Sequence, residues 1–196
     1  MREGAFRPLS ADAMAEGMKR TGAGRKAFDL ALEELEKSAA VIKNRSGLYG
    51  LPEHMNLVVG KLSMSGKGYG FIIPDMKRTT ADTDVFVPGA LLASAMHGDR
   101  VVARLSPSPI PGRAREGEIL RIVERANTKI VGTFAATQSF AFVTPDDQKI
   151  GQDVFIPKKG FHGAKTGMKV VAEITKWPEG RHSAEGEIVE ILGKVG

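Results

Sequence analysis

Aromatic and basic side chains alternate with glycine in one short segment near the middle of the chain, Lys67-Gly-Tyr-Gly-Phe-Ile72. Side chains alternate across a β-strand, so Lys67, Tyr69 and Phe71 share one face of a predicted strand and the glycines share the other. Phe86, between two valines in the next predicted strand, points outward by the same rule. Rings beside a lysine suit the stacking of bases from a single-stranded nucleic acid. We therefore predict a stacking face here; the alternative is that the rings pack against a neighbouring domain.

A second version of this segment follows about 70 residues later, at Gln138-Ser-Phe-Ala-Phe-Val143. The lysine and both glycines are replaced, whereas Phe140, Phe142 and, in a later segment, Phe155 remain. Whether this face contacts RNA or protein stays open. The other candidate RNA contacts are basic residues that could follow the phosphate backbone, namely Arg100, Lys158, Lys165 and Lys169. A solvated surface accounts equally well for any one of these lysines.

These segments belong to a longer internal repeat. Three further blocks recur in the same order: 84–88 at 153–157, 98–103 at 167–172, and 116–120 at 185–189. Each block is short, rich in Val, Ile and Phe, and bounded by Gly, Pro or Asp, which is typical of a strand. Five short strands with one long proline-rich connection, at residues 106–112, favour a small closed barrel over a sandwich.

The repeat divides the chain into three predicted parts. Residues 1–56 form an N-terminal segment, 57–126 a first barrel and 127–196 a second barrel, with the boundary near Glu124-Arg-Ala-Asn-Thr128. The predicted fold class is therefore mainly β, with two tandem five-stranded OB-fold barrels of the cold-shock type after a small α/β segment.

The N-terminal segment has a helical period. Ser10 is a suitable N-cap for a helix over 11–18, and a second helix is predicted over 25–38. Four apolar residues of the second helix lie at the spacing of one face: Phe28, Ala31, Leu32 and Leu35. Residues 40–51 then read as a β-hairpin that turns at Asn44-Arg-Ser-Gly47. This order is that of a truncated winged-helix module that lacks its first helix.

Composition supports a polyanion partner without proving it. The net charge is +5 and the isoelectric point is near 9.5, but the basic excess is spread thinly along the chain. The chain contains no cysteine, and its four histidines show no metal-ligand spacing. We expect no apolar run long enough to cross a membrane, no secretory signal, and a cytoplasmic, monomeric protein.

The segments 67–72 and 84–88 resemble the paired RNA-binding motifs of cold-shock domains, with Pro88 where those proteins usually have histidine. The larger order, including Tyr49-Gly-Leu-Pro52 and Glu173-Ile-Thr-Lys-Trp-Pro178, resembles the N-terminal region of ribonuclease R-type exoribonucleases of the RNB superfamily. This resemblance covers essentially the whole chain.

The resemblance implies a processive 3′-to-5′ exoribonuclease whose reaction occurs elsewhere. In that family a separate downstream domain holds magnesium with several aspartates, so we expect no cofactor and no catalytic residue in these 196 residues. The acidic pairs of this chain, 33/34, 82/84 and 146/147, are explained by turn chemistry or solvation. The expected role is to capture single-stranded RNA and guide it to the catalytic domain.

Three other readings of the residues stay open. The chain could be a free-standing RNA chaperone of the cold-shock type, which would bind RNA with similar affinity. It could also be a protein-interaction or regulatory OB module. A DNA-reading role for residues 1–56 is disfavoured, because the predicted helix over 25–38 carries four acidic residues, Asp29, Glu33, Glu34 and Glu36.

Overall fold

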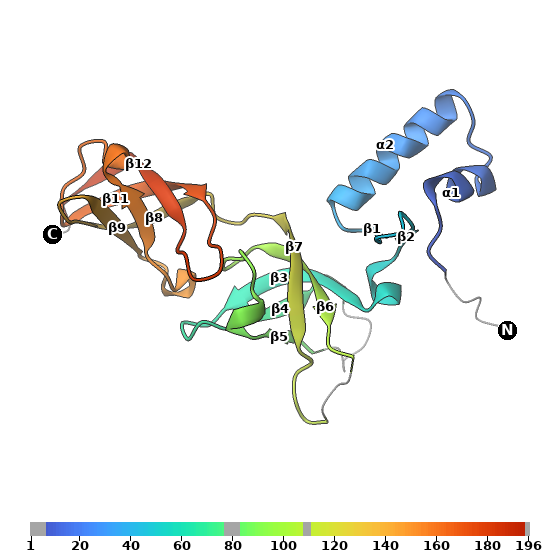
Figure 1. Ribbon diagram of the computed structural model, residues 1–196, viewed down its shortest axis with the longest axis horizontal. Helices are drawn as coiled ribbons and strands as arrows, with labels where there is room; N and C mark the ends of the chain where they lie inside the picture. Colours follow the sequence, from blue (N-terminus) through green and yellow to red (C-terminus); the bar gives the residue numbers. More distant parts are fainter. Residues whose placement is uncertain (1–6, 77–82, 108–110, 195–196) are drawn as a thin grey trace.

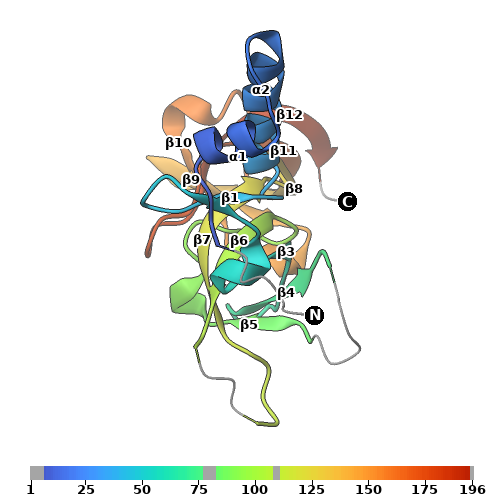
Figure 2. The same ribbon diagram turned by 90° about the vertical axis from the view of Figure 1, so that its right-hand side faces the viewer.

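The computed structural model describes residues 7–76, 83–107 and 111–194. A helical segment, a curled five-stranded sheet and a closed five-stranded barrel follow one another along the long axis in chain order (Figure 1). Figures 1 and 2 both place the two helices on one side of the middle sheet and the described residues that follow β6 (Arg100–Leu105) and precede β7 (Gly117–Glu124) on the other. The predicted class, mainly β with two OB-type barrels, is confirmed.

The N-terminal segment contains the predicted helices and hairpin. Helix α1 (Ala11–Gly17) begins after Ser10, whose hydroxyl accepts a hydrogen bond from the amide of Ala13 at 3.1 Å. Helix α2 (Ala23–Lys37) is followed by β1 (Ile42–Lys43) and β2 (Tyr49–Gly50), which pair in antiparallel fashion. A 3₁₀ turn, η1 (Pro52–Met55), leads into the first barrel.

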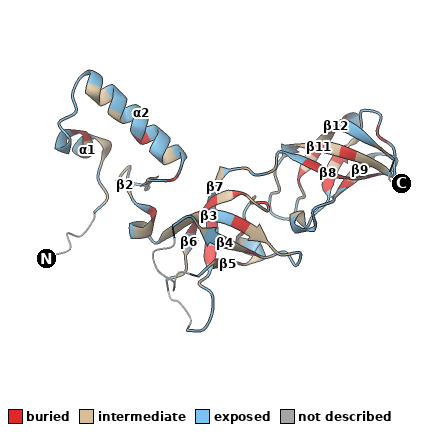
Figure 3. Cartoon of the chain, turned by 180° about the vertical axis from the view of Figure 1, so that it is seen from behind, coloured by how far each residue is buried: buried red, intermediate tan, exposed pale blue. Residues whose placement is uncertain are grey.

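Helix α2 buries less of its apolar face than its spacing predicts. Leu32 is buried, but Leu35 is 44% exposed, and Figure 3 shows most of the helix surface as exposed. The helix is anchored instead at its carboxyl end. Arg100 donates to the carbonyl of Ser38 at 2.8 Å and Arg121 to that of Glu36 at 3.1 Å. Cations are favourable at this end of a helix, so two arginines of the first barrel hold α2 in place.

The first barrel is a sheet in the order β5-β4-β3-β6-β7. Its other strands are β3 (Leu57–Met64), β4 (Gly70–Pro74) and β5 (Val85–Val87), and a 3₁₀ turn, η2 (Gly89–Leu91), follows β5. The sheet curls until its two edges meet. Phe86 and Glu116 form a parallel bridge, and the amide of Phe86 donates to the carbonyl of Arg115 at 2.8 Å.

The second barrel closes in the order β10-β12-β11-β8-β9. Its strands are β8 (Lys129–Ala136), β9 (Phe140–Pro145), β10 (Val154–Pro157), β11 (Met168–Lys176) and β12 (Glu185–Lys194). The turns η3 (Gln148–Ile150) and η4 (Lys158–Gly160) flank β10. Phe155 pairs with Glu185 at the closing seam, where its amide donates to the carbonyl of Ala184 at 2.8 Å. The two repeats therefore close at equivalent residues.

Each barrel has its own core, built from the inward residues of alternating strands (Figure 3). Leu62, Ile72 and Val101 are fully buried in the first barrel, and Phe134, Val143 and Val170 in the second. The predicted proline-rich connection joins β6 to β7, and its residues 108–110 lie outside the described ranges. The limits at 1–56, 57–126 and 127–196 stay a prediction.

The two barrels are joined by a buried carboxylate in the first. Asp99 has no exposed surface and accepts hydrogen bonds from the amides of Met96 and Ala126, both at 2.9 Å, and from Arg125 at 3.0 Å. Arg125 also donates to the carbonyl and the hydroxyl of Ser94, at 2.7 and 2.8 Å. Asp99 and Ser94 therefore fix both the linker and the direction of the arginine.

Arg125 carries the connection into the second barrel. Its guanidinium carbon lies 3.8 Å from the ring centroid of Trp177, which follows β11, within the range of a cation–π contact. Met96 of the first barrel packs in the hydrophobic core of the second, and Asn127 donates to the carbonyl of His97 at 2.9 Å. We call Asp99, Arg125 and Trp177 the inter-barrel joint.

Two neighbours of the joint show how tightly it is packed. Gly98 has φ +87°, and a Cβ there would lie 2.8 Å from the Cβ of Ala126, so glycine is required. Burial lowers the pKa of His97, whose Nδ1 accepts a hydrogen bond from the amide of Met64 at 3.1 Å. Only a ring nitrogen without a proton can accept that bond, so burial and the hydrogen bond both favour the neutral imidazole of His97.

We predict that Asp99→Ala strongly destabilises the protein. The substitution leaves the Arg125 guanidinium partly buried without its carboxylate and two backbone amides without an acceptor, which costs about 3–5 kcal/mol. Urea unfolding followed by circular dichroism measures this loss. Asp153→Ala, at an exposed residue, is the matched control and should change stability by less than about 0.5 kcal/mol. Equal stability of the two variants would contradict the claim that the Asp99 carboxylate stabilises the protein.

Candidate nucleic-acid interface

Three aromatic side chains gather on the first barrel, and we call Tyr69, Phe71 and Phe86 the first ring cluster. Phe71 and Phe86 are opposite each other across β4 and β5, with ring centroids 5.5 Å apart. Tyr69, just before β4, lies 5.9 Å from Phe71 and 5.5 Å from Phe86. All three are partly exposed. The alternation predicted for this strand brings them together on the outer face.

Glycine is needed beside the first ring cluster for two different reasons. A Cβ on Gly70 would lie 2.8 Å from Cδ1 of Leu62, so this position faces a filled core, as the alternation predicts. Gly68 differs from the prediction, because a Cβ there would meet no atom within 4 Å. Glycine is needed there because its φ is +84°. It lies in a turn that is closed by a hydrogen bond from the amide of Ser65 to the carbonyl of Tyr69.

The second barrel presents the same arrangement, and we call Phe140, Phe142 and Phe155 the second ring cluster. Their centroids are 5.4, 5.6 and 5.9 Å apart, and Phe142 faces Phe155 across β9 and β10. Ala141 replaces the buried glycine and is itself fully buried. The loss of the lysine and glycines therefore leaves the ring geometry intact, although whether this cluster contacts RNA stays a prediction.

The two ring clusters have their lysines on different turns. Lys67 is exposed in the turn before β4. In the second barrel Lys158 and Lys159 directly follow Pro157, which pairs with Phe140, and both are exposed. The first barrel has Gly89 and Ala90 at that place. A Cβ on Gly89 would lie 2.5 Å from the carbonyl oxygen of Gly68, so the glycine turn that displays Lys67 excludes a lysine at residue 89.

Two of the predicted RNA contacts form ion pairs within the protein. Arg100 pairs with Asp75, through Nε at 2.8 Å and also through its terminal nitrogen, besides its bond to Ser38. Lys169 occupies the equivalent place and lies 2.5 Å from Asp146 and 3.1 Å from the hydroxyl of Thr133. Both tie the end of one strand to the start of another, and neither belongs to a ring cluster. Their role in RNA contact stays a prediction.

The remaining predicted contact is Lys165, which is exposed in the loop before β11 and whose amide donates to the sulfur of Met168 at 3.3 Å. The structure thus gathers six of the predicted residues into two ring clusters. Lys67 and Lys158 lie beside them in the chain, whereas Arg100 and Lys169 are engaged elsewhere and Lys165 lies in a separate loop.

No metal centre is visible in the described part of the chain. Residues 7–76, 83–107 and 111–194 contain no group of three or more His, Asp or Glu side chains that could hold a metal ion. A two-metal nuclease site needs such a group, so the described residues do not fit one. Asp82, from one of the acidic pairs, lies outside the described ranges. No helix among the described residues is long and apolar enough to cross a membrane.

Comparison with known proteins assigns both barrels. The Ribonuclease B OB domain family matches residues 60–122, in the first barrel, and the Cold shock domain family matches 142–196, in the second. Ribonuclease R of Acidithiobacillus ferrooxidans is 32% identical over 194 residues, which are 98% of this chain and 43% of that protein. Ribonuclease R of Escherichia coli K12 is 33% identical over 162 residues, which are 83% of this chain and 19% of that protein.

The chain is homologous to the N-terminal part of ribonuclease R. It spans less than half the length of these ribonuclease R relatives, 43% of the first and 19% of the second. The predicted resemblance to ribonuclease R is confirmed, and the chain carries the cold-shock and OB domains that the resemblance implies.

Solved structures share the fold. Ribonuclease R of Mycoplasma genitalium in its apo form is similar with a TM-score of 0.60 and 18% identity, over 70% of this chain and 22% of that one. The same protein in complex with ribose methylated single-stranded RNA gives a TM-score of 0.58 at 19% identity, over 70% and 22%. Yeast Ssd1, described as a pseudonuclease, gives 0.59 at 18% identity, over 72% and 23%. At these identities the likeness establishes the fold alone.

Sequence reasoning missed the inter-barrel joint and the arginines that hold α2. Asp99 has no counterpart in the repeat, where Met168 occupies its place, and this asymmetry was the available signal. Trp177 is the single tryptophan and stands in a segment that carries the family resemblance. Its stacking partner Arg125 lies 52 residues earlier (177 − 125), so no local pattern connects them.

We predict that Arg100→Gln loosens the end of helix α2. The variant loses the bond to the carbonyl of Ser38 and the ion pair with Asp75, and a charged hydrogen bond contributes about 1.5–3 kcal/mol. Amide hydrogen exchange in the last turn of α2 should accelerate roughly tenfold or more. Arg104→Gln, on the same strand but exposed and 3.7 Å from Glu118, is the matched control. Unchanged exchange in Arg100→Gln would show that the helix is held by other contacts.

Proposed function

We propose that this chain binds single-stranded RNA through its two barrels and guides it to a catalytic domain of a longer, ribonuclease R-like protein. The observation that carries the proposal is the pair of ring clusters, whose ring centroids have nearly the same spacing, 5.5–5.9 Å in the first and 5.4–5.9 Å in the second, although the residues around them differ. Each barrel keeps three partly exposed rings on its outer face, where a folded core does not require them.

The chemistry of these faces suits a strand of unspecified sequence. One pair of rings in each cluster lies at a large angle, 82° for Tyr69 and Phe71 and 78° for Phe140 and Phe142, so these rings present faces in different directions. Every base has a π-face, so stacking tolerates any sequence. Positive charge for the phosphates comes from exposed lysines near the rings. Lys67 precedes Tyr69 in the chain, and Lys158 and Lys159 follow Phe155.

The relatives support RNA as the partner. The Mycoplasma genitalium ribonuclease R that shares this fold is described in complex with single-stranded RNA. We propose that the longer protein is a magnesium-dependent 3′-to-5′ exoribonuclease whose metal is held by aspartates of another domain. The described residues of this chain then contribute binding and direction, and we propose that they do so as a cytoplasmic monomer.

A second candidate is RNA binding without hydrolysis, as a free-standing chaperone or a regulatory module. The fold of yeast Ssd1, described as a pseudonuclease, resembles this chain about as closely as that of the apo ribonuclease R does, with TM-scores of 0.59 and 0.60, so the fold does not separate the two candidates. An aspartate-rich domain encoded in the same reading frame, and release of nucleotides from the 3′ end by the whole protein, would support the nuclease. Tight RNA binding without nucleotide release supports the second candidate.

We predict that the ring clusters contribute most of the affinity for single-stranded RNA. Replacing Tyr69, Phe71 and Phe86 together by leucine keeps apolar bulk but removes the π-faces, and should weaken binding by about 1–3 kcal/mol for each base no longer stacked. Fluorescence anisotropy of a labelled oligouridylate measures the change. Leucine at Phe140, Phe142 and Phe155 is the matched variant of the second barrel. If neither triple variant loses affinity while both stay folded, the stacking assignment is wrong.

We predict a salt dependence that depends on the exposed lysines and not on Arg100. Each lysine that neutralises a phosphate contributes roughly 0.7 to the slope of log affinity against log salt for a single strand. Lys67→Gln and the pair Lys158→Gln with Lys159→Gln should each lower this slope. Arg100→Gln, whose guanidinium is paired with Asp75, should leave it unchanged. A lowered slope in Arg100→Gln, with unchanged slopes in the lysine variants, would show that Arg100 contacts the phosphates and these lysines do not.

A further inference from the structure

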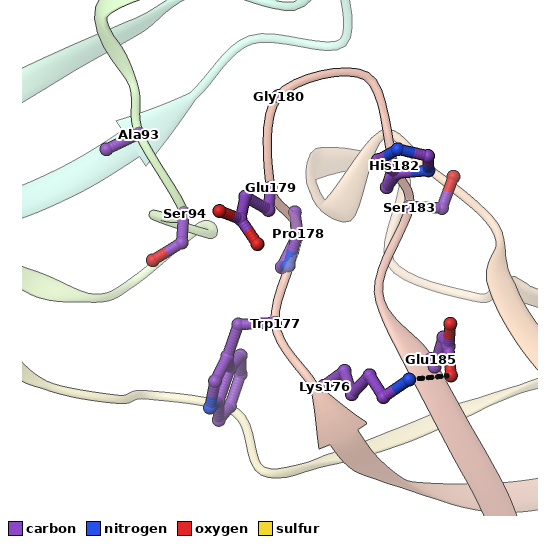
Figure 4. A pocket seen from close by; sticks show the side chains of 10 residues that line it. All are labelled: Ala93, Ser94, Lys176, Trp177, Pro178, Glu179, Gly180, His182, Ser183 and Glu185. Atoms are coloured by element: carbon purple, nitrogen blue, oxygen red, sulfur yellow. Dashed lines mark ion pairs between the residues drawn. The ribbon is translucent and has the colours of Figure 1, made fainter.

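A cavity of about 720 Å³ lies between the two barrels (Figure 4). One wall is formed by Ala93 and Ser94 of the first barrel. The other is the hairpin between β11 and β12, from Lys176 to Glu185, with Trp177 and Pro178 at its base. The size falls within the range of about 300–1,000 Å³ that is typical of sites for small ligands. No ring-cluster residue lines it, so it is separate from the faces described above.

Trp177 is held rigidly at this cavity. Its indole stacks against the guanidinium of Arg125 at 3.8 Å, packs against the core of the second barrel, and lines the cavity with its remaining surface. Arg125 is fixed in turn by Asp99 and Ser94. A ring that is held in place before binding loses little conformational freedom when a second planar group stacks on it.

The charges of the cavity favour an uncharged planar group over a phosphate. Lys176 is paired with Glu185 at 3.2 Å, and Glu179 adds a second carboxylate to the lining. An anion would meet net negative charge there. Polar edges are nevertheless present: the hydroxyl of Ser94 accepts a bond from Arg125 at 2.8 Å and keeps its own proton to donate, and Ser183 and His182 also line the wall.

We propose that this cavity takes one nucleobase of a bound RNA strand, stacked on Trp177. The proposal rests on the RNA-binding function proposed above and adds a third stacking position, located between the barrels. A base in the cavity contacts both barrels at once, whereas each ring cluster belongs to one barrel. The strand's phosphates stay outside, where the two carboxylates do not repel them.

Trp177 is the single tryptophan of the chain, so tryptophan fluorescence reports on the cavity and on the joint that shares this ring. Titration with an unlabelled ribo-oligonucleotide should quench the tryptophan emission saturably, with the same midpoint as the rise in anisotropy of a fluorescein-labelled copy in a parallel titration. Titration with AMP alone should also quench the emission at higher concentration. N-acetyltryptophanamide under the same conditions corrects for absorption of light by the nucleotide.

Two variants test the cavity from opposite walls. Trp177→Ala should weaken RNA binding roughly 5- to 150-fold, the range for the loss of one stacked base. Because this variant also loses the contact with Arg125, Ala93→Tyr fills the cavity from the exposed Ala93 and keeps the three side chains of the joint. It should weaken binding similarly and abolish the quenching. Ala27→Tyr, on the exposed face of α2, is the matched control and should bind like the parent.

The outcomes separate the two proposals. A rise in anisotropy without tryptophan quenching, or unchanged affinity in Ala93→Tyr, overturns the cavity proposal and leaves RNA binding by the ring clusters intact. An absence of any rise in anisotropy overturns the proposed function. In that case the AMP titration decides the cavity by itself: saturable quenching that is lost in Ala93→Tyr supports a base site, and unaltered emission overturns it.

Discussion

The carboxylate of Asp99 has no exposed surface, and three donors from the residues around it converge on its two oxygens. A charge in such a place is tolerated only when it is paired and fully hydrogen-bonded. The pairing with Arg125 meets this requirement, and it also determines where the linker leaves the first barrel and where Trp177 of the second barrel can lie. Together with the Asn127–His97 hydrogen bond and the insertion of Met96 into the second core, this ion pair sets the relative position of the barrels.

The two repeats show which features of an OB surface vary independently. Ring positions are set by strand register, because Phe71 faces Phe86 and Phe142 faces Phe155 on neighbouring strands. The positions of the lysines are set by turns, and turns differ more readily than registers. The glycine turn of the first barrel lies against residue 89 and leaves space for no side chain there. The second barrel lacks that turn and carries two lysines at the equivalent place.

Much of this organisation could be predicted from local pattern. Strand alternation locates all six rings, the repeated blocks locate both barrels, and Ser10 locates the start of α1. The predictions were incomplete where a side chain finds its partner far away in the chain. Arg100 and Lys169 look like free cations in the sequence, yet each has an acidic partner on a different strand. The carboxylate of Asp99 takes its partners from two segments, at Met96 and at residues 125–126, and no periodicity indicates this.

The absence of a second carboxylate has a consequence for how such barrels can be strung together. Met168 occupies the position in the second repeat that Asp99 occupies in the first, so the second barrel cannot form the equivalent ion pair with an arginine that follows it. The joint therefore connects the first barrel to the second, and the second barrel has no carboxylate at the equivalent position to form another such joint. A structural unit that follows the second barrel therefore has to dock through contacts other than this type of ion pair.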